Sequence, residues 1–279
     1  MYIRKIKFFY KKIIYVYIKN EKMNSRNILL IFCIIILFVL HFYLEYGYMK
    51  LFIENFDNAR DKFFEKIDHI YYINLEHRND RKDEFLSNFS PEDEAKIRRV
   101  DAVYTKEKGA IGCLKSHIKA LEMAVSEGKD DDIVMVCEDD FYIKDIFYCN
   151  RMLDWGFKVL EKWDVIMLAQ NIHASEETTL EYPISEEEPE KKAKIFRVIH
   201  AATGSGYLIH KSYIPKLLEI YKGDDARYEA TKEFKAEYCN DVSWRYLQEK
   251  DNWFAFKPAI GVQRSSYSDI QKGVVDYGL

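Results

Sequence analysis

The stretch Ile133-Val134-Met135-Val136-Cys137-Glu138-Asp139-Asp140 decides the expected fold. Its first five residues form a continuous apolar run of strand length, which predicts a strand buried on both faces. Three carboxylates follow directly. At the end of a buried strand they repel one another, and they are costly without a cation. Because carboxylate oxygens suit Mg²⁺ and Mn²⁺, the triplet predicts a site for a divalent ion.

A metal ion at the triplet would hold a diphosphate and neutralise charge on a leaving nucleotide. The triplet taken alone has a second interpretation, because acidic residues after a strand also form solvated turns. The sequence around it is needed to choose between the two.

Further apolar runs and periodic segments surround this strand. Strands are expected at residues 70–73, 97–100, 133–137, 165–169 and 207–209. Helices are expected at residues 79–86, 111–125, 150–161 and 212–221. Strands that alternate with helices predict a mostly parallel α/β sheet, and such sheets bind ligands at the carboxyl ends of their strands.

Residues 175–194 differ from the segments on either side. They are rich in Glu, contain two prolines and show no hydrophobic periodicity. We expect an exposed insertion or mobile loop there.

The N-terminal part of the chain predicts a membrane protein. Residues 1–26 carry eight basic residues and one acidic residue, and the apolar run at 27–44 follows. Its apolar residues, 28–44, are about 25 Å long as a helix, and the positive-inside rule keeps the basic tail in the cytosol. We therefore expect a single-pass type II protein with a lumenal or extracytoplasmic body. A cleaved signal peptide is the alternative, and Met23 is an alternative start.

The remaining chain is predicted to contain a short helical stem at 45–66 and one domain at 67–279. This remainder has 34 basic and 45 acidic residues, which argues against a nucleic-acid partner because such surfaces need clustered Lys and Arg. The five cysteines form no CxxC pattern, so we expect small buried side chains and no zinc site.

Five segments together resemble glycosyltransferase family 25, which includes bacterial lipooligosaccharide galactosyltransferases and collagen-modifying galactosyltransferases. In chain order they are Ile73 to Arg81, Gly109 to His117, Cys137 to Asp140, Thr203 to Ile209, and Gln263 to Asp276. Their order and spacing agree with the family over about residues 67–279.

The resemblance implies a GT-A-type, Rossmann-like fold and an inverting transfer of galactose or glucose from a UDP-sugar. It also implies Mn²⁺ or Mg²⁺ as the cofactor. The acceptor would be a hydroxyl on a glycan, a lipid-linked saccharide or a protein. The membrane would be a further partner, through residues 27–44.

The resemblance also implies roles for single residues. The expected metal ligands are Glu138, Asp140 and Gln263. The expected nucleotide-sugar contacts are Asn74, Arg78, Arg81, Glu138, Asp139 and Gly204. Asp139 has the alternative of pointing away from the site, because successive strand residues alternate.

Inversion needs a general base for the acceptor hydroxyl, and Asp241 is the candidate. Its alternative role is a helix N-terminal carboxylate. For Ser116 and His117, packing and ligand contact remain equally open. Ser268 and Asp269 are candidates for closing over the diphosphate.

Two other functions remain as alternatives. One is a family member without catalysis that acts as a membrane-anchored binding or adhesion module. The other is a different nucleotide-dependent α/β enzyme, which the lack of GxGxxG and GxxxxGK[ST] motifs disfavours.

Overall fold

A computed structural model describes residues 25–89, 91–106, 108–184, 189–268 and 273–275. The side chains of residues 25–35, 38, 56–61, 91–92, 266–268 and 274–275 also lie outside the description. The chain divides into two compact units, residues 1–55 and 56–279. Residues 1–24, which are most of the predicted basic tail, lie outside the described residues.

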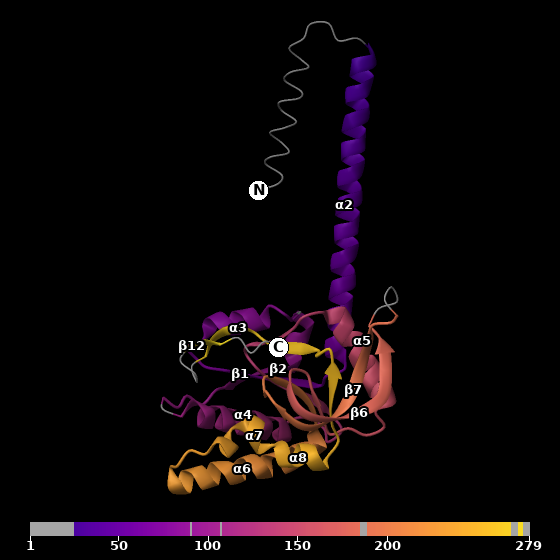
Figure 1. Ribbon diagram of the computed structural model, residues 1–279. Coiled ribbons are helices and arrows are strands. Elements are labelled where there is room, and N and C mark those ends of the chain that lie inside the picture. Colours follow the sequence, from indigo (N-terminus) through magenta and orange to yellow (C-terminus); the bar gives the residue numbers. More distant parts are fainter. Residues whose placement is uncertain (1–24, 90, 107, 185–188, 269–272, 276–279) are drawn as a thin grey trace. The chain divides into compact units, whose positions relative to one another are not determined.

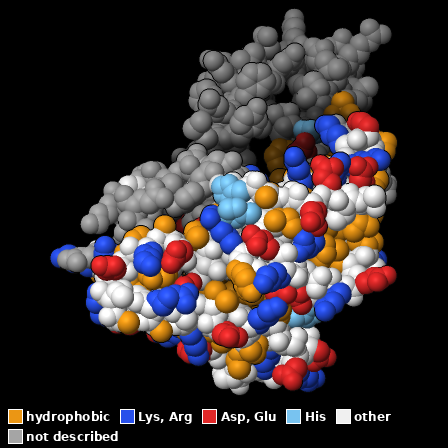
Figure 2. Space-filling view, turned by 60° about the horizontal axis from the view of Figure 1, so that its bottom comes forward, with side chains coloured by type: hydrophobic (Ala, Val, Ile, Leu, Met, Phe, Trp, Pro, Cys, Tyr) orange, Lys and Arg blue, Asp and Glu red, His pale blue; other side chains and the backbone are white. Residues whose placement is uncertain are grey.

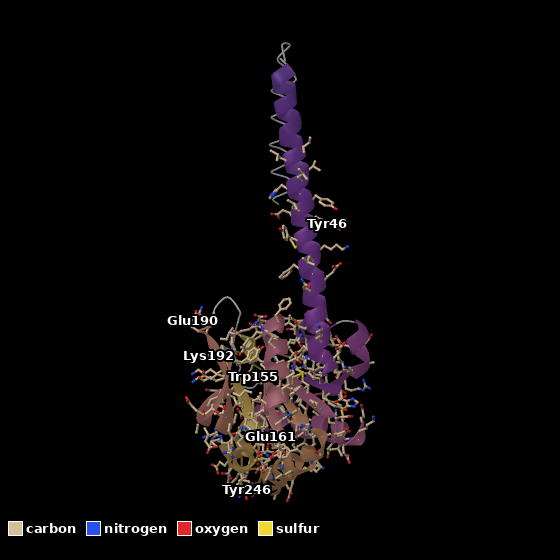
Figure 3. The ribbon with its side chains drawn as sticks, turned by 90° about the vertical axis from the view of Figure 1, so that its right-hand side faces the viewer. Tyr46, Trp155, Glu161, Glu190, Lys192 and Tyr246 are labelled. Carbon is tan, nitrogen blue, oxygen red and sulfur yellow. The ribbon has the colours of Figure 1, made fainter. Side chains whose placement is uncertain are left out.

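Helix α2 spans Ser25–Glu65 and confirms that the stem is helical. Side chains such as that of Tyr46 project outward from it (Figure 3). Within the described residues, no helix has the length and apolar character needed to cross a membrane, so the structure does not support the transmembrane segment predicted at residues 27–44.

The strands build one large sheet and two small ones (Figure 1). The large sheet contains β1 (His69–Asn74), β2 (Ile97–Asp101), β3 (Ile133–Glu138), β5 (Val165–Met167), β6 (Asn171–Pro183), β7 (Lys192–Ala202), β8 (Gly206–His210) and β9 (Trp253–Lys257). The small sheets pair β4 (Phe141–Ile143) with β10 (Gly261–Gln263), and β11 (Ser266–Ser268) with β12 (Gly273–Val275).

The other α-helices of the described chain are α3 (Asn79–Leu86), α4 (Gly109–Ser126), α5 (Ile146–Val159), α6 (Ile214–Thr231), α7 (Asn240–Ser243) and α8 (Arg245–Lys250). Short 3₁₀ helices lie at Pro91–Lys96, Lys211–Tyr213 and Ala236–Tyr238. All five strands and all four helices expected from the sequence are present at or close to their predicted positions.

The large sheet has the order β2-β1-β3-β8-β5-β9-β7-β6. Four of its seven neighbouring pairs are antiparallel, so the prediction of a mostly parallel sheet was wrong. The sheet is mixed because β8 runs antiparallel to both of its neighbours, as does β7. Hydrophobic runs predict burial but carry no information about strand direction.

Both faces of the sheet are covered, and side chains alternate between two cores. On one face Tyr72, Met135 and Cys137 pack with the end of α2, α3 and α5. On the other face Tyr71 and Val136 pack with α4, α6 and α8. Figure 1 shows these two groups of helices on opposite sides of the strands. The result is an α/β fold of three layers.

Residues 175–194, predicted as an exposed insertion or mobile loop, are exposed along β6 but form most of a β-hairpin. Strands β6 and β7 pair antiparallel, with ion pairs from Glu176 to Arg197 and from Glu181 to Lys192 and Lys194. Glu190 and Lys192 lie at the outer end of this hairpin (Figure 3). The prediction failed because β6 is exposed along almost its whole length, so its strand pattern carries little apolar signal.

The surface of the described chain carries charges of both signs. On the face drawn in Figure 2, Lys and Arg side chains are interspersed with Asp and Glu. Four cysteines of the described chain, Cys113, Cys137, Cys149 and Cys239, are free.

Candidate functional site

A cleft of about 350 Å³ opens at the carboxyl ends of β1 and β3. The backbone holds the acidic triplet there: Asp139 donates its N–H to Ile73, and Glu138 donates to Ser205. The predicted site residues that line the cleft are Arg81, Glu138, Asp139, Asp140, Gly204, Asp241 and Gln263. The fold thus brings together seven of the nine.

Asp140 is buried, with 6% of its surface exposed. Its Oδ2 accepts from Arg81 Nη1 at 3.2 Å and from Gln263 Nε2 at 3.2 Å. Its Oδ1 is buried and has no hydrogen-bond partner within the described part of the chain. Burial and, next, the charge of Glu138 raise the pKa of Asp140 to about 7. Oδ2 of this carboxylate is therefore held by two hydrogen-bond donors, and Oδ1 remains available to a ligand.

Asp139 is fully engaged by protein groups. Its Oδ1 accepts from Arg81 Nη1 at 2.8 Å, and its Oδ2 accepts from Asn74 Nδ2 at 2.7 Å. Burial raises the pKa of Asp139 although Arg81 and Asn74 oppose the shift. Asp139 therefore anchors Arg81 beside Asp140.

Asn74 and Arg78 lie outside the lining of the cleft. Asn74 is buried and bonds to Asp139, to the Arg78 carbonyl and to Arg99. It therefore fixes the Asp139 side chain of the triplet from outside the cleft. Arg78 donates from Nε and Nη2 to both carboxylate oxygens of Asp80. These bonds lower the pKa of Asp80 to about 2. The predicted nucleotide contacts of Asn74 and Arg78 stay predictions.

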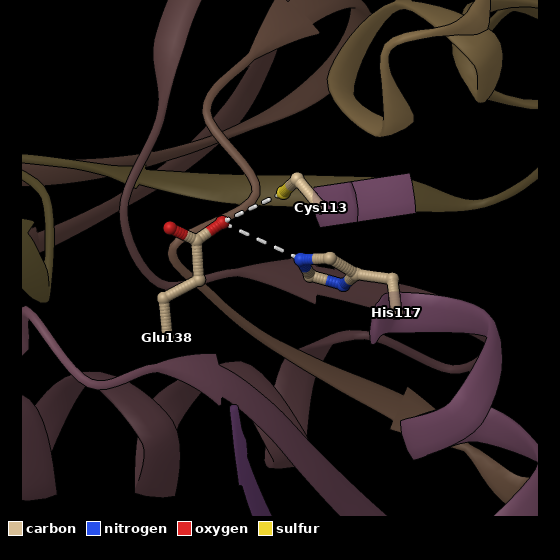
Figure 4. A group of neighbouring side chains, drawn as sticks. All are labelled: Cys113, His117 and Glu138. Atoms are coloured by element: carbon tan, nitrogen blue, oxygen red, sulfur yellow. Dashed lines mark hydrogen bonds and ion pairs between the residues drawn. The ribbon is translucent and has the colours of Figure 1, made fainter. Parts of the chain in front are cut away.

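Glu138 faces two residues of α4 (Figure 4). Its Oε1 lies 3.6 Å from Cys113 Sγ and 3.4 Å from His117 Nε2. Burial opposes ionisation of Glu138, but the interactions with His117, Cys113 and Arg81 together outweigh it and lower the pKa of Glu138. His117 is completely buried, and its Nδ1 lies 3.3 Å from the Tyr207 hydroxyl. Ser116, in contrast, bonds to the backbone of Gly112 and Val103, which is a packing role.

Asp241 follows the start of α7 and is half-buried in the cleft lining. Its Oδ2 accepts from the Thr203 N–H at 3.2 Å. Thr203 has a φ of 80°, which is unusual for a residue with a side chain and is a form of strain found at functional sites. Next to it, a Cβ on Gly204 would lie 2.4 Å from Asn240 Nδ2, so any larger residue there would have to move the Asn240 side chain.

The residues present fit a divalent metal ion. A hard cation prefers carboxylate oxygens, and the unused Oδ1 of Asp140 is such a ligand inside the cleft. Arg81 and Gln263 orient the other oxygen, as outer-shell groups of metal sites do. Gln263 bonds to Asp140 through its amide nitrogen, and its predicted ligation stays a prediction. The Ser268 side chain and Asp269 lie outside the described residues.

Residues 107–226 match the family model of glycosyltransferase family 25 (LPS biosynthesis protein). The match confirms the resemblance to family 25. It includes α4, the acidic triplet and Gly204, while Arg81, Asp241 and Gln263 lie outside it. The match to a glycosyltransferase family supports a transferase activity for this chain, with a sugar donor and an acceptor.

No curated protein matches the chain. Among solved structures, the chain is similar to a 4-diphosphocytidyl-2C-methyl-D-erythritol synthase from Anaerococcus prevotii, with 10% identity over 67% of this chain and 68% of that one and a TM-score of 0.32. It is also similar to a mannose-1-phosphate geranyltransferase from Thermus thermophilus, with 12% identity, coverage of 74% and 76%, and a TM-score of 0.34. At these TM-scores the likenesses carry no argument about this chain.

Two features of the site were missed from the sequence. The first is the double ion pair of Arg81 with Asp139 and Asp140, which needs the tertiary structure to be seen. The second is the cluster of Cys113 and His117 around Glu138. Its signal was present, because a Cys and a His four residues apart share one face of a helix.

Proposed function

We propose that the chain is a metal-dependent, inverting glycosyltransferase with a GT-A-type fold. It moves galactose or glucose from a UDP-sugar to a hydroxyl on a glycan, a lipid-linked saccharide or a protein. The observation that carries the proposal is the buried Asp140, whose Oδ1 has no partner among the described residues and which lines the same cleft as Asp241.

In this proposal Asp140 holds Mn²⁺ or Mg²⁺, with Glu138 as a further ligand. The metal supplies charge neutralisation for the departing diphosphate. Arg81 fixes the orientation of Asp140 through its contact with Oδ2 and adds positive charge beside the phosphates.

Asp241 is the proposed general base. The Thr203 N–H holds its Oδ2, which leaves Oδ1 to accept the proton of the acceptor hydroxyl. The deprotonated oxygen then attacks the anomeric carbon, the bond from that carbon to the UDP oxygen breaks, and the configuration inverts.

Gly204 supports this interpretation of the cleft. A methyl group at this position would displace Asn240, whereas the bare backbone leaves the cleft wall open between Thr203 and Ser205. A sugar ring can approach such a backbone closely.

We further propose, from the sequence pattern and against the lack of a membrane-spanning helix among the described residues, that residues 27–44 anchor the chain as a type II membrane protein with its body outside the cytosol. The basic residues before this run support the orientation. Exposed apolar side chains on α2, among them Leu37, Val39 and Leu40, support burial in lipid. Retention of the chain in membranes after alkaline extraction, with the body protected from protease, tests the proposal; release or digestion contradicts it.

The experiment for the activity is a UDP-sugar hydrolysis panel with Mn²⁺, Mg²⁺ or EDTA. We expect turnover of UDP-galactose or UDP-glucose that EDTA abolishes and that Asp140→Asn lowers at least about 100-fold. Asp154→Asn, a surface carboxylate beside Lys66, is the matched control and should retain activity. Absence of turnover for every donor would favour the non-catalytic binding module, and full activity of Asp140→Asn in EDTA would exclude the metal role.

A further inference from the structure

The cluster of Cys113, His117 and Glu138 has a use that the transfer reaction does not require. One ligand atom of each lies within 4.8 Å of the other two (Figure 4). Cys113 and His117 come from successive turns of α4, and Glu138 comes from the end of β3. Thiolate sulfur, imidazole nitrogen and carboxylate oxygen are the three ligand types that zinc binds in proteins.

The separations between the ligand atoms fit metal ligation. In a tetrahedral zinc site, the bond lengths place sulfur about 3.6 Å from oxygen and nitrogen about 3.4 Å from oxygen. The observed separations are 3.6 Å from Cys113 Sγ to Glu138 Oε1 and 3.4 Å from His117 Nε2 to the same oxygen. A charge-assisted N–H···O bond is instead about 2.7–2.9 Å long. The spacing therefore suits two edges of a coordination tetrahedron better than a strong hydrogen bond.

The surroundings of His117 also suit a ligand. Its Nδ1 lies 3.3 Å from the Tyr207 hydroxyl, so in the metal-bound form a proton on Nδ1 can be shared with that oxygen while the lone pair of Nε2 binds the metal. Zinc-bound histidines commonly hold their second nitrogen in this way. Both His117 and Tyr207 are completely buried, so the ring orientation is fixed before any metal arrives.

A route to the cluster exists from the cleft. Cys113 and Glu138 belong to the cleft lining, and Asn240 Oδ1 lies 3.4 Å from Cys113 Sγ. The fourth position therefore faces the cleft beside an amide oxygen, as in zinc sites with three protein ligands and one open position.

We propose that Cys113 Sγ, His117 Nε2 and Glu138 Oε1 form a zinc site next to the site of Mn²⁺ or Mg²⁺ at Asp140. Glu138 then gives Oε1 to zinc, and its Oε2 is the oxygen left for the other metal. The zinc site binds a thiophilic divalent ion and joins α4 to the end of β3. Binding releases the proton of the Cys113 thiol, because the thiolate is the ligand. The proposal does not depend on glycosyl transfer.

The test is metal binding by the full chain after treatment with a chelator. Equilibrium dialysis should give one Zn²⁺ per chain. Titration with Co²⁺ should give a thiolate-to-cobalt charge-transfer band in the near ultraviolet together with the visible bands of a tetrahedral ion. Absence of that band from the unaltered chain would overturn the proposal without any variant.

Variants then assign the ligands. Cys113→Ser should remove the charge-transfer band, and His117→Gln should weaken Zn²⁺ binding. Tyr207→Phe, which removes an outer-shell partner, should weaken binding roughly 10- to 100-fold. Cys239→Ser is the matched control, since Cys239 lines the same cleft outside the cluster, and it should keep the band.

Asp140→Asn separates the two metal sites. This variant should bind Zn²⁺ as the unaltered chain does, even where transfer is lost. Equal loss of the Co²⁺ band in Cys239→Ser or in Asp140→Asn would contradict the assigned ligands. Persistence of the band in Cys113→Ser would do the same.

Discussion

Arg81 Nη1 lies 2.8 Å from Asp139 Oδ1 and 3.2 Å from Asp140 Oδ2, so one guanidinium joins two buried carboxylates. The arrangement leaves the second oxygen of Asp140 for another cation. It also makes the acidic triplet depend on a residue 58 positions earlier in the chain.

Removing Arg81 should destabilise the fold. Arg81→Met leaves Asp139 and Asp140 buried without their cation, and loss of one partner of a buried ion pair costs about 3–5 kcal/mol. Urea unfolding at neutral pH in EDTA measures this free energy. Asp139→Asn in the Arg81→Met background should recover part of the loss, and strictly additive effects of the two substitutions would contradict the shared ion pair.

Asp140 should make the stability of the metal-free protein fall as pH rises. Its folded-state pKa is about 7 against an ordinary value of 3.8, so between these values the folded state binds a proton that the unfolded chain has released. Its stabilising contribution is complete below pH 3.8 and is lost as pH rises through about 7. Urea unfolding in EDTA across this range should show a steeper decline for the unaltered chain than for Asp140→Asn. Parallel curves would refute the raised pKa.

Asp241→Asn should lower kcat roughly 10²- to 10⁴-fold if Asp241 is the general base. The amide oxygen can still accept from the Thr203 N–H, so donor binding and the fold should be retained. Transfer kinetics with a saturating acceptor, together with UDP affinity, check this. An unaltered kcat with a lowered unfolding temperature would point to the helix N-terminal role instead.

Two glycine substitutions should have opposite effects on stability. A Cβ on Gly206 would lie 2.4 Å from the Phe141 ring, so Gly206→Ala should cost about 1–3 kcal/mol through overpacking. On Gly223, inside α6, the nearest atom would be 3.7 Å away, so Gly223→Ala should stabilise by up to about 1 kcal/mol. Thermal unfolding of both variants tests the pair, and a shift in the same direction would be the contrary outcome.

Much of the site followed from the sequence because its residues lie next to strong local patterns. The buried run before Glu138 predicted both β3 and the position of the carboxylates at the end of a strand. Asp241 was similarly marked by its place at a helix start. Such local signals survive folding because hydrophobic periodicity dominates element formation.

Other features depend on long-range contacts that a single sequence does not encode locally. Examples are the antiparallel direction of β8, the hydrogen bond of Asn74 to Asp139, and the ion pairs of Arg81 with two carboxylates. Phe63 and Phe64, which precede the predicted start of the domain at residue 67, are buried in the same core as Ile67, and the boundary itself stays a prediction. A single helical turn with buried side chains is too short a sequence pattern to locate the start of a domain.

The hairpin of β6 and β7 has a consequence for how the molecule behaves at high concentration. β6 ends the sheet, and the backbone groups on its outer side have no neighbouring strand within the described chain. Such a rim invites a second molecule to add its own strand. Here the β6 register is interrupted three times and the strand ends at Pro183. An incoming copy would meet a broken ladder of hydrogen bonds, so the exposed edge should resist fibril growth and aggregation.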